Sequence, residues 1–245
     1  MVPLLFKPFA RLLAERVAPL EPGRILETAA GTGVVTRAVA EAVPQAEIVA
    51  TDLNPAMLAV AAQRMHSERV SYEQANAQDL PYPEESFDLV LSQFGVMFFP
   101  DKVQAGREAR RVLRPGGHYI VVSFDRLERN PIPRAADAAV EAIFPDDPPR
   151  YMERGPFSCS DPRVIEDDLR AAGFTSIDVD TVALASRVRA RDAAMGMVLG
   201  SPFRAEIERR DPAGLERATN AVEAALREWD GKDAPMSAHI VTAAA

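Results

Sequence analysis

A short apolar segment followed by a turn of very small residues constrains the fold more than any other part of the sequence. Residues 24–28 predict a β-strand that ends on an acidic side chain. Ala29, Gly31 and Gly33 follow, and a turn of such small residues lets a ligand contact the backbone. The helix predicted over residues 32–43 points its free N–H groups at that turn. This order is typical of a nucleoside-binding α/β unit.

A second acidic residue follows the next predicted strand. Residues 47–51 predict that strand, and Asp52 comes directly after it, 21 residues beyond Gly31. An acidic side chain at about this separation can accept hydrogen bonds from both hydroxyls of a ribose. The two segments together predict a site for a cofactor that contains a nucleoside.

Strands and helices alternate through the first half of the chain, which predicts a parallel sheet covered on both faces. The second half is less regular and begins with a segment rich in proline and charge. In the first half we expect further strands at 70–75, 86–92 and 119–124, and helices at 3–18, after Asn54-Pro55 and at 101–112. In the second half we expect a helix at 161–172, a strand at 176–184, two or three helices over 189–229, and a last strand at 239–243.

Composition excludes several classes of protein. The formal net charge of −8 argues against a nucleic acid as the partner. Cys159 is the only cysteine, so no intrachain disulfide can form, and this fits a reducing cytosol. No apolar run approaches the roughly 18 residues that cross a bilayer. We therefore expect a cytoplasmic protein with no membrane span and no metal site.

Three features select among the nucleoside cofactors. Thr36 stands where a dinucleotide-binding motif needs its third glycine. Glu27 would repel a pyrophosphate but can pair with an amine, and no basic residue lies between it and Thr36. Residues 75–81 combine small side chains with Asp79, which could frame a purine and accept from its exocyclic amine. A cofactor with an amine, a ribose and an adenine but no phosphate fits all three, and this is S-adenosylmethionine (SAM).

Five segments in order now resemble the motifs of class I SAM-dependent methyltransferases, in the type 11 group of bacterial small-molecule enzymes. The segments are 27–33, 52–58, 76–82, 87–95 and 112–119. The resemblance covers residues 20–125 and implies a Rossmann-like α/β fold. Its seven-stranded sheet would have the order 3-2-1-4-5-7-6 with an antiparallel seventh strand, helices on both faces and a helical lid.

The resemblance also implies a role for each matching residue. Glu27 would bind the methionyl amine, and Asp52 would bind the ribose hydroxyls. Ala29, Gly31 and Gly33 would line the methionine and ribose through their backbone, although the family usually has glycine at the position of Ala29. The other implied cofactor contacts are Leu53, Met57, Ala77 and Gln78 around the adenine, Asp79 at its amine, and Gln93 and Phe94 beside the sulfonium and the acceptor.

Methyl transfer from a sulfonium is an in-line displacement, so the protein mainly has to position and desolvate the nucleophile. A base is needed only for an acceptor with a proton of high pKa. Asp125, just beyond the strand at 119–124, is a weak candidate for that base. Within a single methyltransferase domain at 1–245, the segments 126–160 and 187–229 are expected to form a helical lid that binds the acceptor.

The lid segments contain many large apolar side chains, which suit a small, partly apolar acceptor or a homodimer interface. They are Phe144, Tyr151, Met152, Phe157, Met195, Met197, Phe203 and Trp229. Elsewhere, packing roles are expected for Met97, Phe98, Phe99, Cys159 and the histidines at 66, 118 and 239. Two other functions stay open: a module that binds SAM or S-adenosylhomocysteine (SAH) without turnover, and an NAD(P)-linked reductase.

Overall fold

A seven-stranded sheet forms the centre of the protein in a computed structural model that describes residues 5–245. The strands are β1 (Arg24–Glu27), β2 (Glu47–Asp52), β3 (Val70–Gln74), β4 (Phe87–Gln93), β5 (Leu113–Phe124), β6 (Ser176–Arg187) and β7 (Asp233–Ala244). Their order is β3-β2-β1-β4-β5-β7-β6, with β7 antiparallel to both of its neighbours. The fold and strand order expected from the sequence are confirmed.

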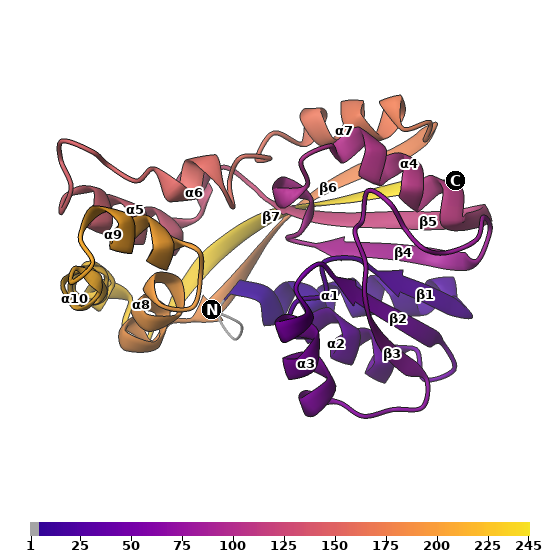
Figure 1. Ribbon diagram of the computed structural model, residues 1–245, viewed down its shortest axis with the longest axis horizontal. Coiled ribbons are helices and arrows are strands. Elements are labelled where there is room, and N and C mark those ends of the chain that lie inside the picture. The colour runs from indigo at the N-terminus through magenta and orange to yellow at the C-terminus, as the bar shows by residue number, and fades with distance from the viewer. Residues whose placement is uncertain (1–4) are drawn as a thin grey trace.

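Helices cover both faces of the sheet (Figure 1). One face carries α1 (Lys7–Val17), α2 (Val34–Ala42) and α3 (Pro55–Arg64), and the other carries α4 (Lys102–Val112) and α7 (Pro162–Ala171). α1 buries Phe9, Leu13 and Val17, which recur on one helical face. Of the helix predicted over 3–18, residues 3 and 4 lie outside the described residues.

β5 begins six residues earlier than the sequence pattern predicts. Leu113 pairs with Phe87, and the next pair joins His118 to Leu89, so β5 carries a bulge opposite β4. Gly116 lies inside this bulge with φ +81°, a backbone conformation that glycine adopts at little cost. Residues 114–117, which lie between the predicted helix and the predicted strand, are therefore part of a bulged strand.

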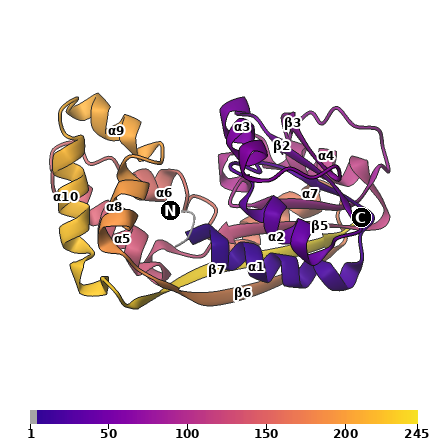
Figure 2. The ribbon, with the colours of Figure 1, turned by 90° about the horizontal axis from the view of Figure 1, so that it is seen from below.

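β6 and β7 extend beyond the end of β5 as a two-stranded ribbon that carries a separate group of helices (Figure 2). β5 pairs with β7 as far as Phe124 and Ala238, whereas β6 and β7 continue to Arg187 and Asp233. This explains why β7 begins six residues before the predicted strand. The ribbon leads to the helical lobe, defined as α5 (Pro131–Glu141), α6 (Tyr151–Arg154), α8 (Ala190–Val198), α9 (Phe203–Arg210) and α10 (Leu215–Ala225).

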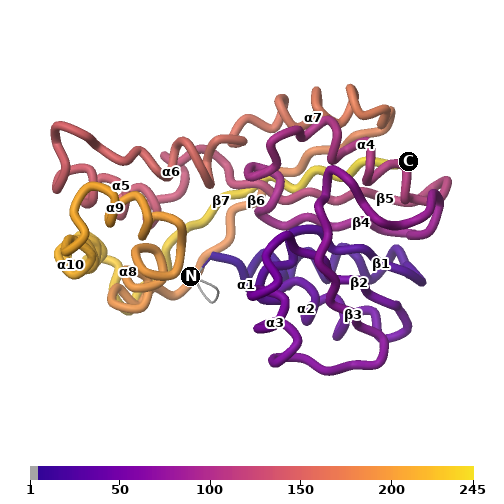
Figure 3. The backbone as a smooth tube through the Cα atoms, viewed as in Figure 1, coloured from indigo at the N-terminus to yellow at the C-terminus, as the bar shows by residue number. Residues whose placement is uncertain are grey.

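The chain enters the helical lobe twice, after β5 and after β6, and returns to the sheet through α7 and β7 (Figure 3). Large apolar side chains hold the lobe together. Of the eight that were expected to line an acceptor site or a dimer interface, Met152, Phe157, Met197 and Phe203 are buried, and Phe144, Tyr151 and Trp229 are half-buried against the core. Only Met195 is exposed, so most of the set packs in the interior.

Candidate active site

The expected cofactor residues gather at one edge of the sheet. β1 pairs in parallel with β2 on one side and with β4 on the other. The carboxyl ends of these three strands therefore meet, and ligands of open α/β sheets bind at such an edge. The turn after β1 lies at the centre of this edge, and we refer to the edge below as the carboxyl edge.

Three residues of the turn have left-handed backbone conformations. Ala29, Gly31 and Gly33 have φ values of +54°, +57° and +71°. The glycines adopt this conformation easily, whereas at Ala29 it costs about 1 kcal/mol. An added Cβ at Gly31 would meet no atom within 4 Å, so this part of the backbone faces open space that a ligand can occupy.

Gly95, which the sequence analysis did not single out, makes room for the methyl group of Ala29. A Cβ at Gly95 would lie 2.6 Å from the Cβ of Ala29 and 3.0 Å from the Oγ of Ser92. Two real carbons cannot approach so closely, so Gly95 must lack a side chain while Ala29 has one. The departure from the family pattern at Ala29 is thus matched by a second small residue after β4.

Asp52 joins the end of β2 to the turn after β1. Its Oδ2 accepts a hydrogen bond from the Gly31 N–H at 2.8 Å, and its Oδ1 accepts from the Asn54 N–H at 2.8 Å. Both bonds orient the carboxylate, and each carboxylate oxygen has a second lone pair for a ligand hydroxyl. The geometry fits the ribose contact that the resemblance implies.

Glu27 is buried at the end of β1, with only 3% of the residue exposed. Its Oε2 accepts a hydrogen bond from the Oγ1 of Thr36 at 2.6 Å. Burial raises the pKa of Glu27 to about 8, against the lowering effects of the Thr36 hydrogen bond and of Arg37. Asp52 raises this pKa further. At neutral pH the empty site therefore holds a protonated Glu27, and a cationic ligand would favour its ionised form.

The carboxyl edge also presents apolar side chains to water beside Asp52. Leu53 is 66% exposed directly after β2, and Met57 is 42% exposed on α3. Exposed side chains of this size beside Asp52 suit contact with a flat apolar ring.

The loop after β3 is anchored to α4. The Oε1 of Gln78 accepts a hydrogen bond from the Asp101 N–H at 2.6 Å, so this side chain faces the start of α4. Asp79 is exposed, and its backbone N–H donates to the carbonyl of Asn76. Ala77 is partly exposed between them. The loop can therefore offer a ligand Ala77, the Gln78 backbone and the Asp79 carboxylate.

β4 ends at Gln93, which has an unpartnered polar atom, and the buried ring of Phe94 follows it. The Nε2 of Gln93 donates to the Phe6 carbonyl at 3.2 Å, while its Oε1 is buried with no hydrogen-bond partner among residues 5–245. Phe94 stacks on Phe124 with 4.0 Å between ring centroids. The prediction that Phe98 packs in the core is wrong, because it lies on a 3₁₀ turn (Val96–Phe98) where it is 54% exposed.

Asp125 is already engaged by neighbouring donors. Its Oδ2 accepts from the Oγ of Ser237 at 2.7 Å, and its Oδ1 accepts from the Arg126 N–H at 2.7 Å. The Nε2 of His239 lies 3.4 Å from the same Oδ1 and 3.1 Å from the Ser160 carbonyl. These contacts tie the carboxylate to β7 and to its own turn, so the geometry does not favour Asp125 as a base.

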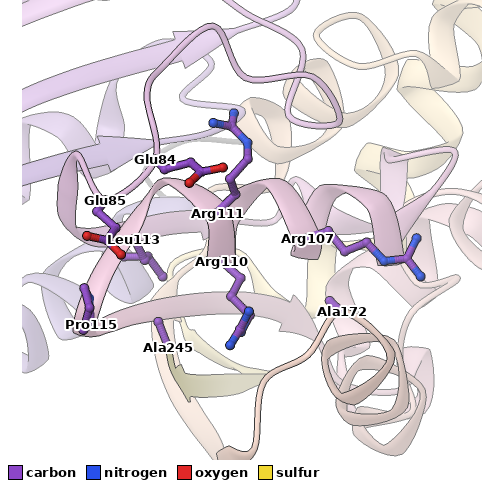
Figure 4. Close-up of a pocket in the computed structure, with 9 residues that line it drawn as sticks. All are labelled: Glu84, Glu85, Arg107, Arg110, Arg111, Leu113, Pro115, Ala172 and Ala245. Carbon is purple, nitrogen blue, oxygen red and sulfur yellow. The ribbon is translucent and has the colours of Figure 1, made fainter.

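A hollow in the described chain lies away from this edge (Figure 4). It has a volume of about 580 Å³, and its lining includes Arg107 and Arg110 of α4 and Leu113 at the start of β5. The start of β5 is the opposite edge of the sheet from the ends of β1 and β2. The hollow is therefore separate from the candidate cofactor site.

Comparison with known proteins identifies the family. A family model described as a methyltransferase domain matches residues 26–121. The ubiquinone/menaquinone biosynthesis C-methyltransferase UbiE of Proteus mirabilis is 31% identical over 168 residues, which cover 63% of this chain and 67% of that protein. The demethylmenaquinone methyltransferase of Clavibacter sepedonicus is 33% identical over 172 residues, covering 66% and 69%. The chain belongs to the class I SAM-dependent methyltransferases.

A solved structure matches the fold of this chain over its whole length. Phosphoethanolamine N-methyltransferase 2 of Haemonchus contortus, in complex with SAH, superposes with a TM-score of 0.63 at 20% identity. The match covers 100% of this chain and 54% of that protein. The cofactor is SAM, as the sequence predicts. No helix in residues 5–245 is long and apolar enough to cross a membrane.

Proposed function

We propose that this methyltransferase transfers the methyl group of SAM to a small, partly apolar molecule held between the carboxyl edge and the helical lobe. Residues 20–125 hold the cofactor, and the segments 126–160 and 187–229 cover the acceptor. The observation that carries the proposal is the set of ligand-ready groups at this edge. They are the buried Glu27 without a cation, the oriented carboxylate of Asp52, and the unpartnered Oε1 of Gln93.

The proposed cofactor contacts follow from this geometry. Glu27 holds the amine, Asp52 holds the ribose hydroxyls, and the turn after β1 contacts both groups through its backbone. The remaining proposed contacts are Leu53, Met57, Ala77, Gln78 and Asp79 around the adenine, and Gln93 and Phe94 at the sulfonium. Bound SAM supplies an electrophilic methyl group. The protein positions the acceptor in line with that methyl group and excludes water.

The acceptor is proposed to be partly apolar because large apolar side chains are exposed after β4 and on the helical lobe. Phe98 follows β4, Met195 lies on α8, and Leu199 directly follows α8; the last two are 43% and 38% exposed. α8 lies on the side of the helical lobe nearer the sheet, whereas α10 is outermost (Figures 1 and 2). Two relatives are named for quinone methylation, so demethylated quinones are the first acceptors to test.

Cofactor titration tests the site. Asp52→Ala should weaken SAM binding at least tenfold in calorimetry, because a charged hydrogen-bond acceptor is lost. Asp178→Ala is the matched control, since Asp178 is an exposed acid on β6 with no side-chain hydrogen bond or ion pair in the described part of the chain. Equal SAM affinity in both variants would exclude the proposed role of Asp52. Binding of NADH with no response to SAM would instead support a reductase.

Turnover is tested with SAM labelled in its methyl group, first against demethylated quinones and then against a metabolite extract. Incorporation of label into an extractable small molecule supports the proposal. Tight SAM binding with no labelled product from either source would support a non-catalytic module. A homodimer through the exposed face of α8 is a competing use of that surface, and a monomer in sedimentation at working concentration would exclude it.

A further inference from the structure

The hydroxyl of Thr36 is the only hydrogen-bond partner of the Glu27 side chain within residues 5–245. Thr36 lies in the first turn of α2, and Glu27 is the last residue of β1. The bond therefore crosses the turn and joins the strand to the helix behind the cofactor site. Both residues are buried, so water cannot replace the bond.

The charged and titratable groups around Glu27 do not neutralise it. Arg37 follows on α2, but its Nη1 donates to the Thr32 carbonyl at 2.9 Å, and it forms no ion pair with Glu27. Asp52 on β2 adds negative charge, and Tyr72 on β3 is near enough for Glu27 to contribute to the raised pKa of its phenol. An ionised Glu27 would thus interact with the charge of Arg37 without forming an ion pair with it, and this interaction does not offset the cost of burial.

We propose that Thr36 is a positioning residue that aims Glu27 at the ammonium group of the cofactor, and that Glu27 releases one proton when the cofactor binds. The inference rests on the proposed role of Glu27 in cofactor binding. When the cofactor binds, the carboxyl proton of Glu27 passes to water, and the resulting carboxylate pairs with an ammonium group that keeps its own protons. The hydroxyl of Thr36 donates to that carboxylate and lowers the cost of ionising it.

A proton released on binding makes the affinity depend on pH. With a pKa of about 8 for Glu27 in the empty site, the dissociation constant should rise about tenfold for each unit that the pH falls below that value. The α-amino group of a free amino acid titrates near 7.7–8.0, so the cofactor amine stays protonated between pH 6 and pH 7. In this interval the pH dependence reports on the protein.

Calorimetry with SAH as the probe tests the coupling. SAH carries the same amine and ribose and is not consumed. Titrations at pH 6.5 in two buffers of different ionisation enthalpy should show about one proton released per SAH bound. The Glu27→Gln variant has no ionisable group at this position. It should bind SAH more weakly and release no proton, and its SAH affinity should not change between pH 6 and pH 7. No release from the unmodified protein, or equal release from the variant, would overturn the coupling.

Substitution at Thr36 tests the positioning role. Thr36→Val keeps the shape of the side chain without the hydroxyl, and it should weaken SAH binding at pH 6.5 roughly tenfold. The loss should shrink as the pH rises toward 8.5, and Thr36→Ser should restore both affinity and pH profile. An unchanged profile in the valine variant would refute the role. If that variant does not fold, Thr36→Ala serves the same comparison.

The inference and the proposed acceptor chemistry fail separately. Release of a proton on SAH binding without any labelled product would leave the coupling intact and remove the proposed transfer. Labelled product with no proton release would support the proposed transfer and overturn the coupling.

Discussion

At Glu27, the requirements of stability and of ligand binding oppose each other. Its pKa rises from an ordinary value near 4.5 to about 8 because folding removes the carboxyl from water. The unfolded chain ionises this group from pH 4.5 upward, while the folded protein without cofactor retains the proton until about pH 8. The folded state is therefore favoured below pH 4.5 and loses that advantage progressively between pH 4.5 and pH 8.

Glu27→Gln should consequently stabilise the protein without cofactor. The amide keeps the shape of the side chain and has no proton to lose, so the free energy of unfolding at pH 7 should rise by about 3 kcal/mol. Urea unfolding at several pH values measures this. The gain should vanish near pH 4, and a gain that grew toward low pH would contradict the assignment.

A second prediction at the residue scale concerns Gly95. Gly95→Ala should lower the free energy of unfolding by about 1–3 kcal/mol, because the new methyl group would overlap that of Ala29. In an Ala29→Gly background the cost should fall by a measurable fraction, and a double-mutant cycle in urea gives the coupling. Additive effects of the two substitutions would show that the contact between Ala29 and Gly95 does not limit the packing.

At the scale of elements, Asn130 connects the end of β5, the start of α5 and β7. Its Nδ2 donates to the carbonyls of Asp125, Arg126 and Ser237 at 3.1–3.2 Å. Its Oδ1 accepts from the Ser237 N–H at 3.0 Å. This buried amide sits where the chain leaves the sheet for the helical lobe, so it sets how the two parts are joined.

Asn130→Ala should lower the free energy of unfolding by about 3 kcal/mol, because the Ser237 N–H and three carbonyls lose a buried partner. Hydrogen exchange should accelerate first in residues 125–131 and 234–238. Asn220→Ala, on the exposed face of α10, is the matched control and should change neither measurement by much. Equal effects of the two variants would contradict the connecting role.

At the scale of the whole molecule, the proposed methyl transfer would require the carboxyl edge and the helical lobe to act on one acceptor. Met195→Lys places a charge on the exposed face of α8 and should raise the KM for the acceptor at least fivefold. SAM affinity should stay unchanged, because Met195 lies on the helical lobe and is not among the residues proposed to contact SAM. Val164→Lys introduces the same charge at an exposed apolar position of α7 and serves as the control. Equal KM values in the two variants would show that the exposed face of α8 does not contact the acceptor.

Much of the candidate site could be predicted because its signals are local. A strand, a glycine turn and a helix occupy one continuous segment, and Asp52 follows its strand directly, so backbone preferences alone place these residues at one edge. Gly95 and the hydroxyl of Thr36 were missed as partners of Ala29 and Glu27. Each partner is recognised only by a contact, and neither position stands out from its neighbours in the sequence.

Asp125 and Phe98 show what could not be predicted from the sequence. The position of Asp125 after β5 was predictable, but Ser237 and His239, which engage it, lie more than a hundred residues further along the chain. Phe98 was assigned to the core on its apolar character, whereas a 3₁₀ turn exposes it. Hydrophobicity predicts which residues can be buried, and the path of the backbone decides which are.

The sequence by itself determined the family and the cofactor, because these depend on short motifs, and the resemblance to the family implied the order of the strands. The tertiary structure alone decided the state of the site. The burial of Glu27 beside Thr36 makes it a protonated acid when the site is empty, and the ribbon of β6 and β7 carries the helical lobe beyond the sheet. Both depend on desolvation and pairing between segments distant in sequence, which no local pattern encodes.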